Sequence, residues 1–344
     1  MNSISRICVL LFSLLVVTST VVLAQDKAKP RNGEGVHTFL KRHNRTGTAY
    51  HKQFLELNKG KFGKNNTLKK DVTYILPSLS DKKVSKSPLS ENTTNGTSRK
   101  NKLFGPKYED YRIKSDKLKG ASFFLSSGHG GPDPGAIGNI NGRIVHEDEY
   151  AYDIILRLAR NLLEEGATVH IIIQDAKDGI RDDKYLANSN RETCMGEVIP
   201  INQVARLKQR SDKINSLSKK DKSKYKRAVF LHLDSRDNKQ KQIDVYFYHA
   251  DKSPDGKRLA NTIRETFDNH YNTHQPNRGY SGTVSPRELY VLNNTTPVGI
   301  YAELGNIQNA FDQRRFLEPD NRQALANWMC RGFIKDYENS KKRK

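Results

Sequence analysis

The stretch SFFLSSGHGGPDPGAIG, residues 122–138, joins an apolar segment to a loop rich in glycine and proline. The first part, SFFLSS, has an apolar centre, which is typical of a strand buried in a sheet. The second part surrounds one histidine, His129, with glycines that let the backbone turn sharply. The chain lacks the GxxxxGK[ST] and GxGxxG patterns of phosphate-binding loops. We therefore interpret this loop as one that presents His129 at the end of a strand.

Segments typical of strands and helices alternate through the region that follows this loop. Residues 147–165 place apolar side chains at helical spacing and stop at Gly166. The other expected strands are 168–174, 227–233, 243–249 and 298–304, and the other expected helices are 201–217, 254–271 and 318–338. This alternation predicts an α/β fold, a twisted and largely parallel sheet with helices on both faces.

Residues 175–200 interrupt this alternation with a polar connection that is long for a compact domain. We consider two interpretations of this insertion, a lid or regulatory loop over the site and a solvated excursion of the surface.

Four side chains with suitable chemistry fall where ligands collect in an open α/β sheet, at the carboxyl ends of its strands. His129, His232 and Glu303 lie at or near the ends of expected strands, and Glu147 opens the helix after the glycine-rich loop. Two histidines and a carboxylate can bind one Zn²⁺ and leave its fourth position to water. A second carboxylate can then move the proton of that water.

Each of these four residues also has a purely structural interpretation. His129 can be an ordinary loop histidine, and His232 a buried histidine whose hydrogen bonds are satisfied. Glu147 in the first turn of a helix is stabilised by the helix dipole alone, and Glu303 can be a partner in a buried ion pair. No HExxH helix is present, so spacing alone does not define a metal site.

The first 25 residues, MNSISRICVLLFSLLVVTSTVVLAQ, place Arg6 ahead of an apolar run that ends in small residues. This pattern predicts a signal peptide over residues 1–24, with an uncleaved membrane anchor as the alternative. Cleavage leaves Cys194 and Cys330, too few for a disulfide scaffold. We expect them to stay unpaired, one as a loop thiol and the other as a buried thiol.

The chain carries a net charge of +21, and residues 26–100 contribute +11 of it, with 17 basic and 6 acidic side chains. Such a basic segment suits an anionic partner. Because the chain is expected to be exported, we favour an anionic envelope polymer or a membrane surface, and we expect no nucleic acid as a partner.

Two segments precede the large domain. Residues 79–101 are polar and almost free of bulky apolar side chains, so we expect a flexible linker. Residues 33–78 place short apolar segments around a helical piece and end in Ile75-Leu76-Pro77. This arrangement resembles a lysin-motif domain, a small α+β (βααβ) module that binds glycans containing N-acetylglucosamine. A small basic module without glycan specificity is the alternative.

The large domain resembles the zinc-dependent N-acetylmuramoyl-L-alanine amidases over residues 103–338. The likeness rests on an ordered set of blocks: SSGHGGPDPGAIG, HEDEYAYDIILRLARNLLEEGATVHII, RLKQRSDKIN, VFLHLDS, LYVLNNTTPVGIYAELGNIQN and the closing helix. It implies a phosphorylase/hydrolase-like amidase domain. It also implies an exported bacterial enzyme, periplasmic and associated with the cell wall, that acts on peptidoglycan in wall catabolism and organisation.

The resemblance also assigns roles to residues. It makes His129, Glu147 and His232 the zinc ligands and Glu303 the catalytic glutamate, which moves the proton of the zinc-activated water. It aligns other positions with a site-shaping loop, with structural positions and with the asparagine after the glutamate block: Asp133 and Gly135, Arg210 and Asn215, and Asn309, respectively.

The chain departs from the family pattern at two points. His232 is followed by Leu233-Asp234, where the family usually has Ala-Asn, and Asn306 stands where an aromatic residue is usual. These departures concern substrate preference rather than the reaction. Two alternatives stay open, a zinc peptidase that acts on the stem peptide and a non-catalytic protein that binds peptidoglycan. The sequence does not define an activator protein, an oligomeric state or a stem-peptide preference.

Overall fold

The structure, a computed structural model, divides into two compact units, Met1–Asn92 and Thr93–Lys344. It describes residues 26–31, 34–45, 48–63, 66–79, 98–234, 244–275 and 278–343. The predicted signal peptide, residues 1–24, and most of the predicted linker lie outside these ranges. Among the helices of the described ranges, none combines the length and the apolar character that a membrane span requires.

The small unit has the element order expected for it, a strand, two helices and a strand. These elements are β1 (Lys27–Ala28), α1 (Val36–Arg42), α2 (Thr48–Leu57) and β2 (Tyr74–Ile75). The two strands pair in antiparallel fashion, so the unit begins before residue 33, the predicted start. A two-residue strand that contains a lysine leaves no apolar signal, which is why the sequence did not reveal it. Aromatic rings of Phe39, Phe54 and Tyr74 form the core between the helices and this strand pair.

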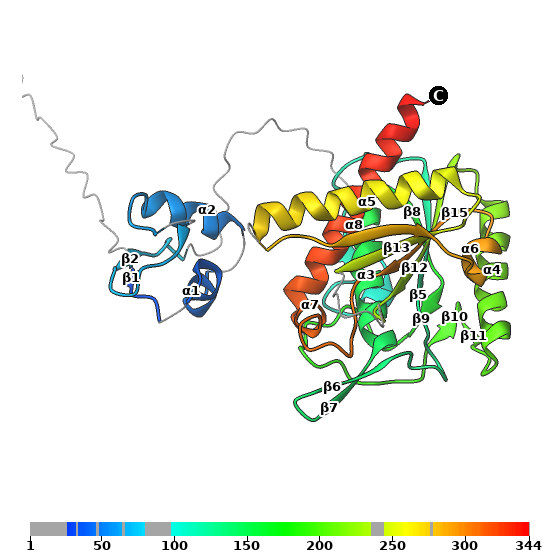
Figure 1. The fold of residues 1–344 in the computed structure, drawn as a ribbon, viewed down its shortest axis with the longest axis horizontal. Coiled ribbons are helices and arrows are strands. Elements are labelled where there is room, and N and C mark those ends of the chain that lie inside the picture. The colour runs from blue at the N-terminus through cyan, green and yellow to red at the C-terminus, as the bar shows by residue number, and fades with distance from the viewer. Residues whose placement is uncertain are drawn as a thin grey trace, which may run out of the picture. The chain divides into compact units, whose positions relative to one another are not determined.

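A six-stranded sheet forms the centre of the large unit (Figure 1). Its spatial order is β14 (Gly282–Pro286), β13 (Val245–His249), β15 (Val298–Glu303), β12 (Tyr225–His232), β5 (Ala121–Ser127) and β8 (Thr168–Ile171). Neighbouring strands are parallel except at one place, where β13 runs antiparallel to β15. The predicted α/β class and largely parallel sheet are confirmed.

Helices cover both faces of this sheet because alternate strand residues point to opposite sides. Phe123 and Leu125 of β5 pack in one core with residues of α3 (Glu147–Glu164), α5 (Pro254–His274) and α8 (Pro319–Lys342). Phe124, from the same strand, packs in a second core with residues of α4 (Gln203–Lys220) and α6 (Tyr290–Asn293). Figure 1 shows α4 and α6 on one side of the sheet and α3 and α8 on the other.

Several short elements surround this framework. The large unit also contains β3 (Arg99–Lys100), η2 (Lys102–Phe104), β4 (Asp110–Tyr111), β6 (Ile137–Ile140), β7 (Arg143–His146), β9 (Ile173–Gln174), β10 (Thr193–Cys194), β11 (Glu197–Val198) and α7 (Gln313–Leu317). β3 pairs with β4, so the last residues of the predicted linker belong to the large unit. β6 and β7 form a hairpin whose turn, Asn141-Gly142, has positive φ at both residues.

The insertion at 175–200 packs against the domain at several of its residues, while other parts of it are exposed. Its strands β10 and β11 extend from β9 as a small antiparallel sheet, and Cys194 and Ile199 are buried in the second core. A purely solvated excursion does not describe the buried residues of this segment, whereas Glu197 and Val198 are exposed. Cys194 and Cys330 are both free, as expected, but both are buried and Cys194 lies in β10, so the expectation of one loop thiol is wrong.

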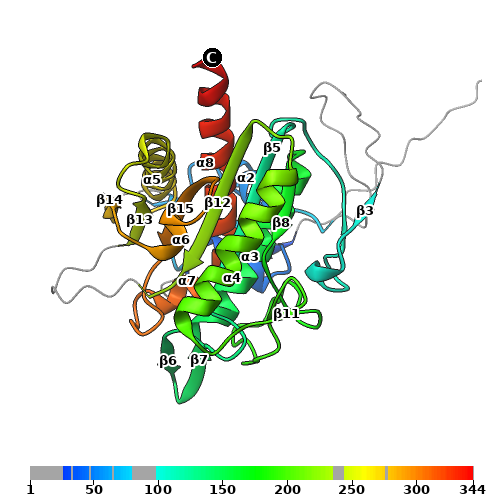
Figure 2. The same ribbon diagram turned by 90° about the vertical axis from the view of Figure 1, so that its right-hand side faces the viewer.

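The strand arrangement determines where a site can form. β5, β12 and β15 are parallel neighbours, so their carboxyl ends meet at one edge of the sheet. Figure 2 shows the arrow of β12 directed toward the end of the domain where the β6–β7 hairpin lies. The loop after β5 and the start of α3 reach the same edge.

Candidate metal centre

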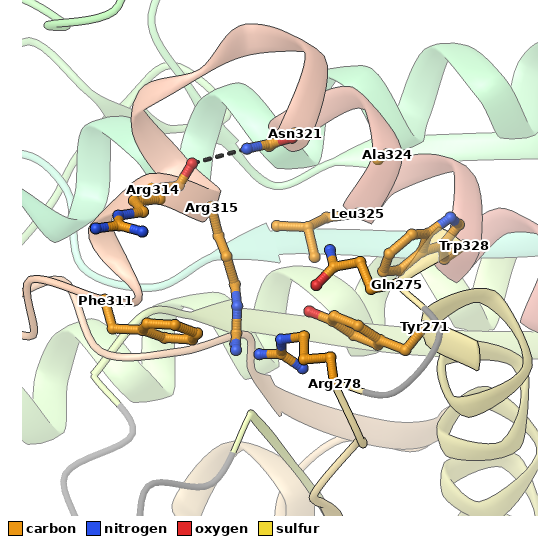
Figure 3. Close-up of a pocket in the computed structure, with 10 residues that line it drawn as sticks. All are labelled: Tyr271, Gln275, Arg278, Phe311, Arg314, Arg315, Asn321, Ala324, Leu325 and Trp328. Atoms are coloured by element: carbon orange, nitrogen blue, oxygen red, sulfur yellow. Dashed lines mark hydrogen bonds between the residues drawn. The ribbon is translucent and has the colours of Figure 1, made fainter. Parts of the chain in front are cut away.

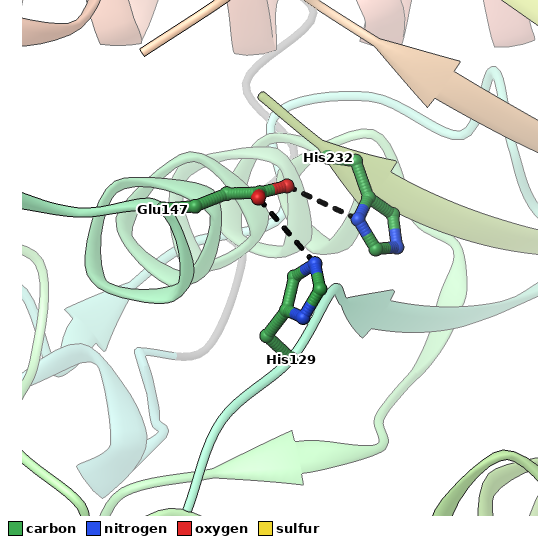
Figure 4. A group of neighbouring side chains, drawn as sticks. All are labelled: His129, Glu147 and His232. Carbon is green, nitrogen blue, oxygen red and sulfur yellow. Dashed lines mark hydrogen bonds and ion pairs between the residues drawn. The ribbon is translucent and has the colours of Figure 1, made fainter. Parts of the chain in front are cut away.

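His129, Glu147 and His232 come together at this edge of the sheet (Figure 4). Each offers one ligand atom, and the three atoms lie within 4.8 Å of one another. His129 belongs to the loop after β5, Glu147 is the first residue of α3 and His232 is the last residue of β12. Nε2 of His129 lies 3.4 Å from Oε2 of Glu147, and Nδ1 of His232 lies 3.1 Å from Oε1.

Hydrogen bonds orient the ring of His129. Its Nδ1 lies 2.8 Å from Oδ2 of Asp133, and Arg206 donates to that same oxygen at 2.6 Å. Burial opposes the charged imidazolium, but the hydrogen bonds to Asp133 and Glu147 outweigh it and raise the pKa of His129 to about 10. Because an ionised carboxylate only accepts hydrogen bonds, Nδ1 donates to Asp133, and Nε2 is the ring atom that faces Glu147. This is the arrangement by which carboxylates orient metal-binding histidines.

Glu147 is completely buried and held at both carboxylate oxygens. The backbone N–H of Ala136 donates to Oε2 at 2.8 Å, and that of Leu233 donates to Oε1 at 2.9 Å. Burial alone would raise the pKa of this carboxyl, but the hydrogen bonds to His129 and His232 lower it well below its usual range. An ionised carboxylate in this position needs positive charge nearby, because an unpaired buried charge is very costly.

His232 is fixed by packing rather than by a carboxylate on its far side. Its ring stacks on Tyr301 with centroids 4.4 Å apart and planes 15° from parallel. Burial is the main cause that lowers the pKa of His232 to about 4, so its imidazole is neutral and keeps a lone pair for a ligand bond. A Cβ at Gly128 would lie 2.2 Å from Cε1 of this ring, so the first glycine of the loop makes room for it.

Glu303 ends β15 beside His232, its parallel partner in the sheet register. Its Oε2 accepts a hydrogen bond of 2.7 Å from the backbone N–H of Asp234. Burial, followed by the nearby carboxylate of Glu147, raises the pKa of Glu303 well above its ordinary range. The side chain is 5% exposed and can hold a proton next to the three clustered side chains.

These residues fit a metal ion that prefers nitrogen and carboxylate ligands. The cluster supplies two imidazole nitrogens and one buried carboxylate from three rigid elements, and the ligand atoms are close enough to share one ion. Gly135, at φ +71°, leaves the space that this grouping needs, because a Cβ there would lie 2.7 Å from Oε2 of Glu147. A cavity of about 150 Å³ reaches both histidines from the side of α4.

The other residues that the sequence singled out have structural contacts. Arg210 is buried and donates to the backbone carbonyls of Ser127 and His129. Asn215 accepts from the backbone N–H of Thr296 at 2.7 Å and donates to Asn294. Oδ1 of Asn309 accepts from the backbone N–H of Phe311 at 2.9 Å. Arg210 thus supports the loop that carries His129, whereas the two asparagines shape loops farther along the chain.

Sequence reasoning missed three supporting residues, Arg206, Tyr301 and Glu192. Glu192 lies in the insertion, where its Oε2 accepts from the backbone N–H of Gly131 at 2.8 Å and its Oε1 accepts from Ser189 at 2.8 Å. The insertion therefore packs behind the loop that presents His129. In the sequence, Glu192 is one acidic residue in a polar segment, close to Cys194. Nothing in that position predicts a contact with Gly131.

Comparison with known proteins defines the class. A family profile described as N-acetylmuramoyl-L-alanine amidase matches residues 124–335, more than half of the chain. The chain belongs to this family.

Among individual relatives, a Staphylococcus aureus protein named "Probable cell wall amidase LytH" is 27% identical over 226 residues. The match covers 65% of this chain and 61% of that protein, so it spans less than two thirds of the relative's length.

Solved structures of amidases also resemble the large unit. The N-acetylmuramoyl-L-alanine amidase AmiC2 of Nostoc punctiforme is 19% identical, covering 64% of this chain and 99% of that one with a TM-score of 0.45. The apo form of the amidase Ami1 from Mycobacterium abscessus is 16% identical, covering 64% of this chain and 100% of that one with a TM-score of 0.46.

Proposed function

We propose that this protein is a zinc-dependent N-acetylmuramoyl-L-alanine amidase. Its substrate would be the amide bond between N-acetylmuramic acid and L-alanine in peptidoglycan. The observation that carries the proposal is the grouping of His129, Glu147 and His232 within 4.8 Å, with Glu303 on the neighbouring strand. Family membership supports the type of bond that is cleaved. The two imidazoles and the carboxylate support zinc as the metal.

The three clustered side chains would hold Zn²⁺, which when bound polarises the substrate carbonyl and acidifies a water molecule. Asp133 and the backbone N–H groups of Ala136 and Leu233 keep the ligand atoms of His129 and Glu147 in place. This support comes from a strand end, a helix start and the loop after β5.

Glu303 would serve as the general base and then the general acid. Its carboxylate takes a proton from the attacking water as the new C–O bond forms, and returns it to the amide nitrogen as the C–N bond breaks. The products are the carboxylate of N-acetylmuramic acid and the free amino group of L-alanine. Hydrolysis consumes one water and needs no further reactant.

We also propose that the protein is exported by its first 24 residues and acts at the cell wall, in the periplasm. The small unit would retain the enzyme on glycan strands as a lysin-motif-like module, with its basic charge contributing. The βααβ order of this unit supports the module, since the two helices pack on an antiparallel strand pair.

Digestion of purified sacculi tests the proposed reaction. We expect the zinc-loaded protein to release intact stem peptides that begin with L-alanine and to leave the glycan chains unmodified, as measured by mass spectrometry. A chelator should stop the release, and added zinc should restore it. Release of truncated stem peptides would instead identify a zinc peptidase. Binding to sacculi without any release, in the presence of zinc, would identify a non-catalytic wall-binding protein.

A further inference from the structure

A second pocket lies in the large unit, and none of its lining residues belongs to the candidate metal centre (Figure 3). Its volume is about 410 Å³, which falls in the range of small-molecule sites, roughly 300–1,000 Å³. It is built from the end of α5, the loop after Glu303, α7 and the first half of α8. Tyr271, Arg278, Phe311, Arg314, Arg315 and Trp328 are among the residues that line it.

The walls of this pocket are aromatic. The rings of Tyr271 and Trp328 meet edge to face with centroids 5.1 Å apart, and Leu325 also lines the pocket. Phe311 forms the opposite wall and is 46% exposed, so part of its ring is accessible to a ligand. Flat apolar walls of this kind suit a ligand with a flat apolar face, such as a sugar ring.

The pocket is also positively charged. The guanidinium of Arg278 lies between the two walls, 4.6 Å from the ring centroid of Tyr271 and 5.5 Å from that of Phe311 (Figure 3). Arg278 and Arg315 both pair with one carboxylate, that of Asp244. The two positive charges of Arg278 and Arg315 are therefore balanced mainly by the single negative charge of Asp244.

Arg314, at the rim of the pocket, adds a third positive charge. Its side chain is exposed and makes no hydrogen bond or ion pair to any residue within the ranges that the structure describes, although its backbone carbonyl accepts from Asn321. Asp312 adds one negative charge, and it is turned toward Arg315 and the backbone of Asn306. The pocket thus keeps a net positive charge, and a guanidinium at the rim is suited to a carboxylate.

A sugar that carries a carboxylate combines both features. In peptidoglycan the lactyl group of N-acetylmuramic acid is bound in an amide, and the reaction proposed above converts it into a free carboxylate. We propose that this pocket is a second binding site that takes N-acetylmuramic acid of the cleaved glycan strand, with the sugar against Phe311 and Trp328 and the carboxylate on Arg314. This inference rests on the proposed function, since it names a product of that reaction as the ligand.

The sequence provides a direct readout, because Trp328 is the chain's one tryptophan. Fluorescence of the full-length protein reports on this pocket without contributions from other indoles. We expect free N-acetylmuramic acid to change this fluorescence in a saturable manner. N-acetylglucosamine, the same sugar without the lactyl carboxylate, and D-lactate, the carboxylate without the sugar, should each bind at least about tenfold more weakly.

Two variants separate the contributions, and a third is the control. R314A should weaken N-acetylmuramic acid about tenfold and remove its advantage over N-acetylglucosamine, because it deletes a charge-assisted hydrogen bond. F311A should weaken both sugars. R112A removes an exposed arginine elsewhere in the large unit and should change neither.

The outcomes distinguish this site from the proposed reaction, because the titration needs no hydrolysis. No saturable change, or an unchanged affinity in R314A, would overturn the second site even if sacculi are cleaved. An equal response to glycerol phosphate would overturn the assignment to a carboxylated sugar. Binding that depends on Arg314, in a protein that fails to cleave sacculi, would keep the second site and remove the amidase proposal.

Discussion

Asp133 links two side chains that are far apart in the sequence. Its Oδ2 accepts from Nδ1 of His129 at 2.8 Å and from Arg206 at 2.6 Å. Arg206 is thereby connected to His129, a proposed metal ligand, through the carboxylate of Asp133. At the scale of single residues, we expect the candidate metal centre to depend on such positioning groups as well as on the proposed ligands.

The variant D133N tests this positioning. The amide cannot reproduce a charged acceptor between His129 and Arg206, so we expect metal affinity to fall about 10–100-fold with little change in fold. Competition with a chromophoric chelator measures the affinity. The matched control is D212N, an exposed aspartate on α4 that pairs with Lys208. An unchanged affinity in D133N would remove Asp133 from this role.

Gly135 offers a second test, because the chain contains a matched glycine. Gly135 and Gly142 have similar positive φ angles, +71° and +79°, so alanine costs each site a comparable backbone strain of roughly 1–2 kcal/mol. Only at Gly135 would the new Cβ meet His129 and Glu147, whereas Gly142 has open space. We expect G135A to lose bound metal and G142A to retain it, as measured by metal content of the purified proteins. Equal metal content would contradict the close packing of the centre.

Part of this site was predictable from residue type and position. His129, Glu147, His232 and Glu303 stood at strand ends or a helix start, where an α/β sheet gathers its ligands. Arg206 and Tyr301 were not predictable, because their contacts join segments of unrelated spacing. One arginine among several on a basic helix, or one aromatic residue in a buried strand, carries no mark of the partner that it will meet.

At the scale of elements, the insertion at 175–200 supports the loop that presents His129. Glu192 holds the backbone N–H of Gly131, and Cβ of Glu192 would lie 3.3 Å from a Cβ placed on Gly130. Two strands, β10 and β11, position Glu192 by attaching the insertion to β9. The loop after β5 is thus fixed from one side by the insertion and from the other by α3.

Replacing Glu192 tests this support. E192A leaves the buried N–H of Gly131 and the hydroxyl of Ser189 without this acceptor, at a cost of about 1–3 kcal/mol for an unsatisfied group. We expect the melting temperature to fall by several degrees and metal affinity to fall with it, measured by calorimetry and by chelator competition. E197A, an exposed glutamate on the same small sheet, is the control. A destabilised E192A with unchanged metal affinity would limit Glu192 to stability.

The elements differed in how well they could be predicted. Long helices and buried strands were predicted to within a few residues, because their apolar periodicity spans several turns or a full strand. The edge strand β14 was missed, since GTVSP is short, polar and ends in proline, which is tolerated at an edge. The expected strand 168–174 divides into β8 and β9 at Ile172. The backbone N–H of Ile172 donates a hydrogen bond to Leu125 of β5, and its carbonyl accepts one from Met195 in the insertion.

At the scale of the whole molecule, the chain consists of two units with separate hydrophobic cores. The small unit and the segment after it carry about half of the net positive charge, and the large unit carries the candidate metal centre. Wall retention and hydrolysis are therefore expected to be separable.

A chain without residues 26–97 tests this separation and leaves β3 in place. We expect it to bind sacculi several-fold more weakly than the full chain, with the difference shrinking as salt is added, because screening weakens exposed charges. Its rate on a soluble muropeptide should match that of the full chain. Cosedimentation with sacculi and chromatography of the muropeptide products measure these two properties. Sacculus binding that responds neither to salt nor to the deletion would contradict a retention role.

The central claim is that zinc held by His129, Glu147 and His232 acts with Glu303 in hydrolysis. The most direct measurement compares wild-type protein with E303Q, determining zinc content and the release of stem peptides from sacculi in the same preparations. The account predicts one zinc per chain in both proteins and a rate in E303Q that is lower by at least about 100-fold, the usual contribution of a general acid–base. Full activity in E303Q at equal zinc content would contradict it.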